Sequence, residues 1–525
     1  MTAEGPAKPS PAGSEDVGLE TLARQGSILE RVAHGAAWVV IWRMATRLLG
    51  VVSTLILARL LVPADFGLVA LSYGFVGALD VLTAAGVEQA IIRDDRADRD
   101  LYDTGFTINL LRALGMAIVL AAGAGLYGTL LNDRRLDAIV LVFAADTAVT
   151  GLTNIGVLDY QRYLAFDKEF VFKLVPRVVS FAICLFAAVV WRSYWALVAG
   201  IVTGDVATVL FSYRMHPYRP RLTLRAWRRL MGFSLWMWVL GLISTLRGQA
   251  PNLLLGRLAG AGPVGILSIG IEVASLPITE FVAPLRRASF AGFAATRRSG
   301  ESGNQAQDFT RLLAAMAAVI LPAGVGISLV ADPVVRLAFG AQWVAAVPII
   351  EVLGVAGTLT MFGQVSASVF TAHAWMRPMA KINVVTTAAC LLLLAVLVPR
   401  FGVLGAVVAI ALTDALNQAT YLVVTLHRLD LRLANLFARV WRSLLGTVVM
   451  AFVLFRLGLG WSTLSGAGWT LASHLVEAVA LGAGVYFVTV VAAWLASGRP
   501  DGAEADLLEL ASRFVRSFLL RRKRA

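Results

Sequence analysis

The sequence predicts an all-α polytopic membrane protein with two six-helix pseudo-repeat lobes around a central cavity and two further helices at the C-terminus. Hydrophobic residues make up 58% of its 525 residues and charged residues only 15%, and the mean hydropathy is +0.75. Apolar runs long enough to cross a bilayer recur along the chain. Lys and Arg gather on one side of these runs, and one stretch of the first half recurs in the second. These three observations predict the fold.

The apolar runs define about fourteen candidate transmembrane helices. In the first half they lie at residues 35–61, 67–91, 105–131, 136–158, 171–191 and 195–214. In the second half they lie at 231–256, 264–288, 311–337, 346–371, 381–398 and 403–426, and a last pair lies at 441–460 and 471–495. Residues 1–32 contain no leading apolar run, so we expect the first span itself to direct the chain to the membrane.

The positive charges predict the orientation of these spans. The side that holds both termini carries 34 of the 46 Lys and Arg residues, the opposite side carries eight, and four lie within spans. Cytoplasmic loops collect Lys and Arg in this way. The sequence therefore predicts a multi-pass membrane protein with both termini in the cytoplasm. An even number of spans is required, which fourteen satisfies.

An internal repeat relates the two halves. When the sequence is shifted by 198 residues, Leu57–Gly67 meets Leu255–Gly265, which places Arg59 on Arg257 and the final glycine on the final glycine. Each copy ends one apolar run, forms a short turn and begins the next run. An offset of six spans preserves orientation, so the lobes are predicted to be parallel repeats with a site between them.

The predicted organisation follows from the spans and the repeat. It consists of a flexible cytoplasmic tail (1–34), an N-lobe (35–215), a basic cytoplasmic linker (216–230), a C-lobe (231–427), two further spans (441–495) and a basic amphipathic cytoplasmic tail (496–525). In the last tail, apolar side chains recur at helical spacing before the run Arg521–Arg524. Such a segment either lies on an anionic leaflet or is a solvated terminus.

Ionisable residues inside the apolar runs are the candidates for function. Ten of them lie well inside predicted spans: Arg43, Arg47, Asp80, Arg112, Asp146, Arg247, Glu272, Glu280, Asp414 and Glu477. Each would cost about 2.5–3.5 kcal/mol at a helix centre that faces lipid. These side chains are therefore expected to face protein, one another or water.

Three arginines are candidates for substrate binding. Arg43 and Arg47 are four residues apart on one face of the first span, and Arg247 lies in the seventh span. A guanidinium stays charged and pairs well with phosphate oxygens, so these residues are predicted to hold an anion such as a pyrophosphate in a water-filled cavity. The alternative is that they neutralise Asp80, Glu272 or Glu280 and lock the helices together.

Two further groups of residues are candidates for coupling and for gating. Acids at cavity-facing positions are candidates for coupling transport to protons or cations: Asp80, Glu272, Glu280 and Asp414. The turns of the repeat supply candidates for an outer gate, Arg59, Pro63, Arg257 and Pro263. The two arginines next to these turns are better explained as interfacial anchors or helix caps.

Several functional classes are excluded or disfavoured by the sequence. The net charge of +13 is explained by the orientation of the spans, and no soluble basic domain is available for nucleic acid. Two GxGxxG matches lie in an apolar span and in a turn, where they have no preceding strand. No His/Cys cluster of metal-binding spacing occurs, and Cys184 and Cys390 lie inside apolar runs as predicted free thiols. We therefore expect no enzyme, no cofactor and no metal.

Several stretches resemble the polysaccharide transporters of the MOP superfamily, which include Wzx-type flippases and colanic-acid-exporter-like proteins. They are LARLLVPADFGLVALS (Leu57–Ser72), GVEQAIIR (Gly86–Arg93), DYQRYLAFDKEF (Asp159–Phe170), WALVAG (Trp195–Gly200), HPYRPRL (His216–Leu222), NLLLGRLAGAGPVGILS (Asn252–Ser268) and PRFGVLGAVVA (Pro399–Ala409). The resemblance runs from about Gly35 to Leu426 and rests on these stretches in combination.

The resemblance implies two six-helix bundles around a cavity that alternates between inward-open and outward-open states. It also implies transport of undecaprenyl-pyrophosphate-linked oligosaccharide repeat units to the outer leaflet for exopolysaccharide, capsule or lipopolysaccharide O-antigen synthesis. Membrane lipids, a polysaccharide polymerase and glycosyltransferases would be its partners. The alternatives are a peptidoglycan-precursor flippase, a multidrug antiporter of the same superfamily, a membrane glycan polymerase or ligase enzyme, and a scaffold without transport.

Overall fold

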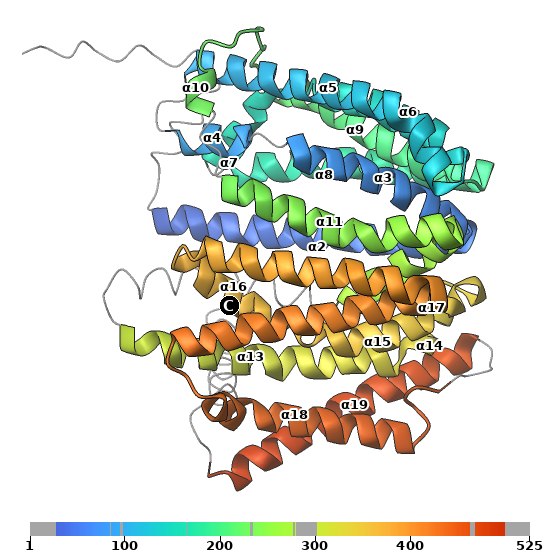
Figure 1. Ribbon diagram of the computed structural model, residues 1–525, viewed down its shortest axis with the longest axis vertical. Coiled ribbons are helices and arrows are strands. Elements are labelled where there is room, and N and C mark those ends of the chain that lie inside the picture. Colours follow the sequence, from blue (N-terminus) through green and yellow to red (C-terminus); the bar gives the residue numbers. More distant parts are fainter. Residues whose placement is uncertain are drawn as a thin grey trace, which may run out of the picture. The chain divides into compact units, whose positions relative to one another are not determined.

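The computed structural model describes residues 28–83, 86–94, 98–163, 165–230, 235–276, 279, 302–462 and 468–498. All the secondary-structure elements in these ranges are helices (Figure 1). By the packing of its helices the chain divides into two compact units, Met1–Gly265 and Ile266–Ala525. The predicted tail 496–525 lies almost wholly outside the described residues, as do the first 27 residues and Glu280.

The first unit contains the helices that precede and follow the predicted linker. In chain order they are α2 (Ile28–Leu60), α3 (Pro63–Thr83), α4 (Val87–Arg93), α5 (Arg99–Leu131), α6 (Arg135–Thr150), η1 (Ile155–Leu158), α7 (Asp159–Arg162), α8 (Phe166–Trp191), α9 (Trp195–Met215), α10 (Trp227–Leu230) and α11 (Leu235–Ala259). Within this unit α8 packs on α9 and α2, α6 packs on α3, α5 and α9, and α11 packs on α3.

The second unit contains the remaining helices. A helix over Ala261–Leu276 begins within the first unit and continues into the second. It is followed by α13 (Ser302–Leu329), α14 (Ala331–Ala338), η2 (Ala341–Ala346), α15 (Val347–Gly357), α16 (Thr360–Ala372), α17 (Met376–Arg428), α18 (Leu433–Arg456) and α19 (Gly468–Ala496). Here α13 packs on α15 and α18, α16 packs on α17, and α18 packs on α19.

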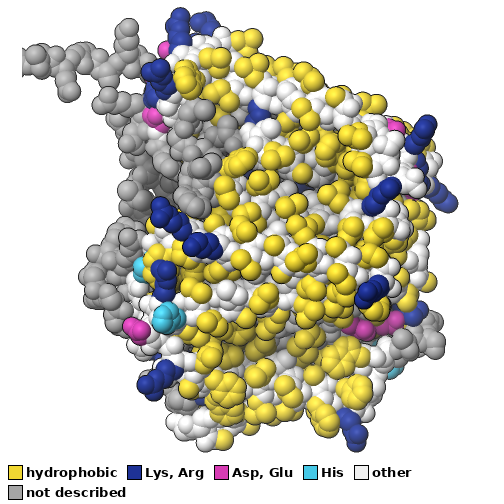
Figure 2. Space-filling view, in the orientation of Figure 1, with side chains coloured by type: hydrophobic (Ala, Val, Ile, Leu, Met, Phe, Trp, Pro, Cys, Tyr) yellow, Lys and Arg dark blue, Asp and Glu magenta, His cyan; other side chains and the backbone are white. Residues whose placement is uncertain are grey.

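The described residues confirm a multi-pass membrane protein. Eight described helices are long and apolar enough to cross a membrane, or up to ten when each of two bent pairs counts as one span. Large apolar side chains such as Phe186 (70% exposed) and Ile118 (69% exposed) cover their outer surfaces. Figure 2 shows hydrophobic side chains over much of the visible surface of the described residues. The count of fourteen spans stays a prediction.

Three predicted spans differ in shape from straight helices. The run 67–91 ends as a helix at Thr83, and the separate short helix α4 follows. The run 136–158 bends by 73° between α6 and the helices over Ile155–Arg162, where the side chain of Asn154 accepts a hydrogen bond from the amide of Gly156 (2.9 Å) and so begins a new helix. The run 346–371 bends by 45° before Thr360.

The spans predicted at 381–398 and 403–426 form one continuous element, α17, with a break at Gly402. Gly402 has φ 55° and ψ −128°, a backbone conformation that side-chain-bearing residues rarely adopt. The break therefore separates two helical segments at the position that the sequence predicts for a short loop.

Both cysteines are free and buried, as predicted. Cys184 of α8 packs closely against Gly200 of α9. A Cβ atom added to Gly200 would lie only 2.5 Å from the Cβ atom of Cys184.

The predicted linker is packed against the first unit. Backbone amides of Arg221, Thr223 and Ala226 donate to side chains on one face of α5, at distances of 2.9 to 3.1 Å. Ala226 and Leu230 are buried in an apolar cluster with residues of α4 and α5. The linker is thus held by satisfied hydrogen bonds and apolar contacts along its length.

Candidate functional site

The two turns of the internal repeat meet in the first unit. Pro63 begins α3, and Pro263 lies in the first turn of the helix over Ala261–Leu276. Arg59 and Arg257 lie in the last turns of α2 and α11, and both are exposed. The four residues predicted for the outer gate therefore flank two helix starts.

The two helix starts cross at a pair of equivalent glycines. A Cβ atom on Gly67 would lie 1.8 Å from the carbonyl oxygen of Ala261, and one on Gly265 would lie 1.9 Å from the carbonyl oxygen of Pro63. Normal C···O contacts are about 3.3 Å or longer, so no side chain fits at either position. The two positions that the 198-residue repeat aligns are thus in direct backbone contact.

The contact continues along α3 and α11. Leu71 of α3 packs against Gly256 of α11, where a Cβ atom would be 2.9 Å from its side chain. At the other end of α3, the indole Nε1–H of Trp238 donates to the carbonyl oxygen of Leu82 (3.0 Å). The second helix of the predicted N-lobe and the first helix of the predicted C-lobe therefore lie along each other within the first unit.

The predicted anion-binding arginines lie on the same two helical elements as these turns. Arg47 on α2 and Arg247 on α11 are both half-buried. Arg43 lies on α2 one turn before Arg47, but its side chain is outside the described residues. Their role in binding stays a prediction.

The predicted coupling acids are placed in different settings. Asp80 is exposed on α3 and forms an ion pair with Arg112 of α5, whose Nη1 lies 2.8 Å from its Oδ1. Neutralisation of Asp80 by an arginine is therefore observed, although the arginine is Arg112 and not one of the three predicted candidates. Glu272 is exposed on the helix over Ala261–Leu276, and Asp414 is half-buried on α17.

A carboxyl pair that the sequence did not predict lies between α6 and α9. Asp146 is 8% exposed, and its carboxyl group lies beside that of half-buried Asp205. The sequence marks Asp146 as a charged residue inside a span, and Asp205 has the same signal at the centre of the run 195–214. Their pairing could not be read from the sequence, because the two residues belong to spans that are not consecutive.

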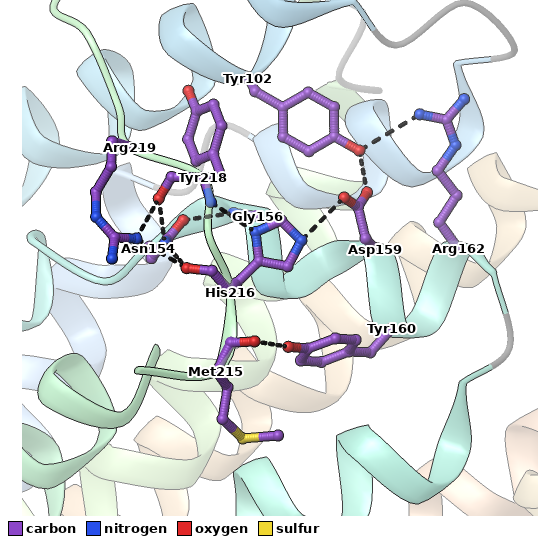
Figure 3. Close-up of polar contacts among 10 residues, drawn as sticks. All are labelled: Tyr102, Asn154, Gly156, Asp159, Tyr160, Arg162, Met215, His216, Tyr218 and Arg219. Atoms are coloured by element: carbon purple, nitrogen blue, oxygen red, sulfur yellow. Dashed lines mark hydrogen bonds and ion pairs between the residues drawn. The ribbon is translucent and has the colours of Figure 1, made fainter. Parts of the chain in front are cut away.

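A buried polar network joins two of the family-like stretches at the predicted cytoplasmic end of the first unit (Figure 3). His216 is 3% exposed, and its Nε2 lies 3.4 Å from Oδ2 of buried Asp159. The amide of Tyr218 donates to its Nδ1 (3.2 Å), so the proton of the neutral ring lies on Nε2 and faces the carboxylate. The hydroxyl of Tyr102 donates to the other oxygen of Asp159.

Neighbouring groups complete this network. The side-chain amide of Asn154 donates to the carbonyl oxygen of Tyr218 (2.7 Å), and the hydroxyl of Tyr160 donates to that of Met215 (2.8 Å). The hydroxyl of Tyr218 donates to Asp103, and burial together with this bond raises the pKa of Tyr218. The network fixes the chain where α9 ends and the linker begins. His216 thus has a specific structural role beyond packing at the interface.

The described residues contain no group of three or more His, Cys, Asp or Glu side chains that could hold a metal ion.

Comparison with known proteins identifies the family. The family model described as "Polysaccharide biosynthesis protein" matches residues 56–348. This chain belongs to that family. The matched region includes both repeat turns, the network around Asp159 and His216, and the linker.

Several proteins similar in sequence to this chain are named for polysaccharide biosynthesis. The chain is 25% identical over 365 residues to the lipopolysaccharide biosynthesis protein WzxC of Escherichia coli (strain K12), covering 69% of this chain and 74% of that protein. It is also 25% identical over 332 residues to the succinoglycan biosynthesis transport protein ExoT of Rhizobium meliloti (strain 1021), covering 63% of this chain and 67% of ExoT. The teichuronic acid biosynthesis protein TuaB of Bacillus subtilis (strain 168) is 22% identical over 352 residues, covering 66% of this chain and 72% of TuaB.

Solved structures define the fold. The inward closed conformation of the lipid II flippase MurJ superposes with a TM-score of 0.69 at 12% identity, covering 88% of this chain and 100% of that one. An inward-facing multidrug resistance MATE transporter of the MOP superfamily superposes with a TM-score of 0.59 at 14% identity, covering 73% and 94%. The protein therefore has the same all-α fold as these two membrane proteins.

Proposed function

We propose that this protein is a flippase that moves lipid-linked oligosaccharide repeat units across the bacterial inner membrane for exopolysaccharide, capsule or O-antigen assembly. The family match over residues 56–348 is the observation that carries the proposal. It is supported by the relatives, one of which is named a transport protein, and by the likeness of the fold to a lipid II flippase. Both termini are in the cytoplasm in this proposal.

The substrate would cross with its polar head in a central cavity while its lipid tail remains in the bilayer. Arg43, Arg47 and Arg247 would hold the pyrophosphate, because guanidinium groups pair with phosphate oxygens and remain charged in a desolvated site. Half-burial of Arg47 and Arg247 supports this role, since it lowers the dielectric around them without removing access.

The turns with Arg59, Pro63, Arg257 and Pro263 would form the outer gate. The crossing of Gly67 and Gly265 supports a closed gate in this state, because backbone atoms in contact leave no opening for a sugar. Release to the outer side requires α3 and the helix over Ala261–Leu276 to separate at this crossing. Small residues allow such a contact to close tightly.

The candidates for coupling transport to protons or cations are Glu272, Glu280 and Asp414. Asp80 is a weaker candidate, since Arg112 neutralises it and joins α3 to α5. A polysaccharide polymerase and glycosyltransferases would be partners that consume and supply the substrate. Lipid II is the second candidate substrate, because the MurJ fold covers 88% of the chain.

The proposal is tested in cells of the native host that lack the gene. We expect loss of the surface polysaccharide and accumulation of its lipid-linked repeat unit, both restored by the wild-type gene. Arg47→Gln should fail to restore export while it is inserted normally, whereas Arg214→Gln, an exposed arginine at the end of α9, should restore it. Normal surface polysaccharide in the deletion strain would refute the proposed function, and full export by Arg47→Gln would remove Arg47 from the site.

A further inference from the structure

The carboxyl pair of Asp146 and Asp205 differs from acids of the described ranges that are neutralised by an arginine. Asp80, Asp133 and Asp332 each have an arginine partner at 2.7 or 2.8 Å. In the carboxyl pair, by contrast, the two acids are neighbours of each other. They lie on α6 and α9, which pack together. Among the described residues no ion pair neutralises either of them.

The charged groups around the pair come from all the helices packed against it. From α3, Tyr73 lies close enough to interact electrostatically with both acids, and Asp80, which also acts on Tyr73, is already paired with Arg112 of α5. From α8, Arg177 interacts electrostatically with Tyr73, and its side chain is exposed. The surroundings therefore supply no fixed positive charge that would hold both acids ionised.

Two ionised carboxylates in this contact would be unstable. Like charges in a desolvated site repel strongly, and carboxylate oxygens accept hydrogen bonds but cannot donate them. Consistent with this, Oδ1 of buried Asp146 has no hydrogen-bond partner among the described residues. A proton on one carboxyl group removes one charge and supplies the O–H donor that joins the two.

We propose that Asp146 and Asp205 form a proton-binding site of this transporter and that exchange of the shared proton drives its transport cycle. The two carboxyl groups lie beside each other, and the described residues contain no group of three or more His, Cys, Asp or Glu side chains that could hold a metal ion. Calcium and magnesium also take six or more oxygen ligands, which a pair of carboxylates does not supply. The second half of the proposal rests on the proposed flippase function.

A physical path links the pair to the gate. Tyr73 of α3 packs edge-on against Phe143 of α6, with ring centroids 5.9 Å apart, and Phe143 precedes Asp146 by one helical turn. The same helix α3 carries Gly67 at the crossing with Gly265. Loss of the proton leaves two adjacent negative charges, which pushes α6 and α9 apart and disturbs the packing of α6 on α3.

Proton binding is tested on the purified full-length protein by infrared difference spectroscopy during a pH titration. The wild-type protein should show a C=O band of a protonated carboxylic acid that is absent from Asp146→Asn/Asp205→Asn. In either single variant, the midpoint of the titration of the remaining acid should shift to lower pH by about one unit or more, because the negative charge of the second acid is gone. Asp133→Asn, which removes an acid already paired with Arg135, should leave the band unchanged.

Two results would overturn the proton site. One is an identical band in the double variant, and the other is loss of the wild-type band when NaCl is added at constant pH, which would indicate a sodium site. Asp146→Glu keeps a carboxyl group at this position, so this variant should retain both the band and the thermal stability of the wild-type protein.

Coupling is tested in proteoliposomes with fluorescently labelled lipid-linked oligosaccharide extracted from the native host. An imposed pH gradient should accelerate transfer by the wild-type protein several-fold and leave the rate of Asp146→Asn/Asp205→Asn unchanged. An equal response of the two proteins would overturn the role of the pair in coupling. Absence of transfer by the wild-type protein would instead overturn the proposed function, while the infrared band would still decide the proton site.

Discussion

Replacement of Gly67 by alanine should open the proposed outer gate. The added Cβ atom would lie 1.8 Å from the carbonyl oxygen of Ala261, compared with a normal contact of about 3.3 Å. The two helix starts must therefore separate by roughly 1.5 Å to accept it. Gly265→Ala should act in the same way, since its Cβ atom would lie 1.9 Å from the carbonyl oxygen of Pro63.

The cost of this overlap sets the size of the effect. Overpacking of a well-packed contact typically costs about 1–3 kcal/mol. If the open state is free of the overlap, the ratio of open to closed molecules rises by roughly 5- to 150-fold. The change is large enough to measure as a rate of chemical labelling.

The assay uses a buried reporter at the same contact. Leu71 is 3% exposed against Gly256, so Leu71→Cys should react slowly with a membrane-impermeant maleimide added outside, once Cys184 and Cys390 are replaced by alanine. Addition of Gly67→Ala should raise the labelling rate about tenfold or more. Gly77→Ala is the matched control, because a Cβ atom at this position of α3 meets nothing within 4 Å.

A labelling rate in Gly67→Ala equal to that in Gly77→Ala would refute the closed gate. Unfolding is distinguished by a second reporter, Val140→Cys, which is fully buried in α6 and should stay unreactive. Gly262→Ala provides the corresponding control for Gly265→Ala, since it too has open space around its added Cβ atom.

Two further predictions concern polar contacts of the first unit. Asp159→Asn removes the carboxylate that faces Tyr102 and His216, and should destabilise the purified protein by about 1–3 kcal/mol and expose the linker to proteolysis, whereas Asp167→Asn at an exposed position should not. Equal stability of the two variants would show that the network does not hold the linker. Asp80→Arg and Arg112→Asp should each reduce insertion or stability, and the double exchange should recover most of the loss; a double variant as poor as the singles would show that their ion pair is not a stabilising contact.

The fold was largely predictable because its signals are local. Apolar runs and the Lys and Arg bias follow directly from the cost of charge in lipid, and each predicted range overlaps one or more described helices. The bend at Asn154 was not predicted, since it depends on one side chain that begins a new helical turn within an apolar run. The break at Gly402, by contrast, coincides with a predicted loop.

The candidate site was only partly predictable because its contacts join distant parts of the chain. The repeat aligned Gly67 with Gly265, but alignment of two positions does not imply that they touch. Each acid of the pair Asp146 and Asp205 is a single charge in its own apolar run, so only the packing of α6 on α9 brings them together. The sequence marks His216 only as part of a family-like stretch, and its contact with Asp159 crosses from one such stretch to another.

Transfer of substrate between leaflets tests the central claim most directly. The purified protein is reconstituted into liposomes that contain fluorescently labelled polyprenyl-pyrophosphate-linked oligosaccharide from the native host, and a membrane-impermeant quencher reports the fraction in the outer leaflet over time. We predict transfer by the wild-type protein, little transfer by Arg47→Gln, and wild-type transfer by Arg214→Gln. If the wild-type protein gives the same rate as protein-free liposomes, the chain is not a flippase for this class of lipid.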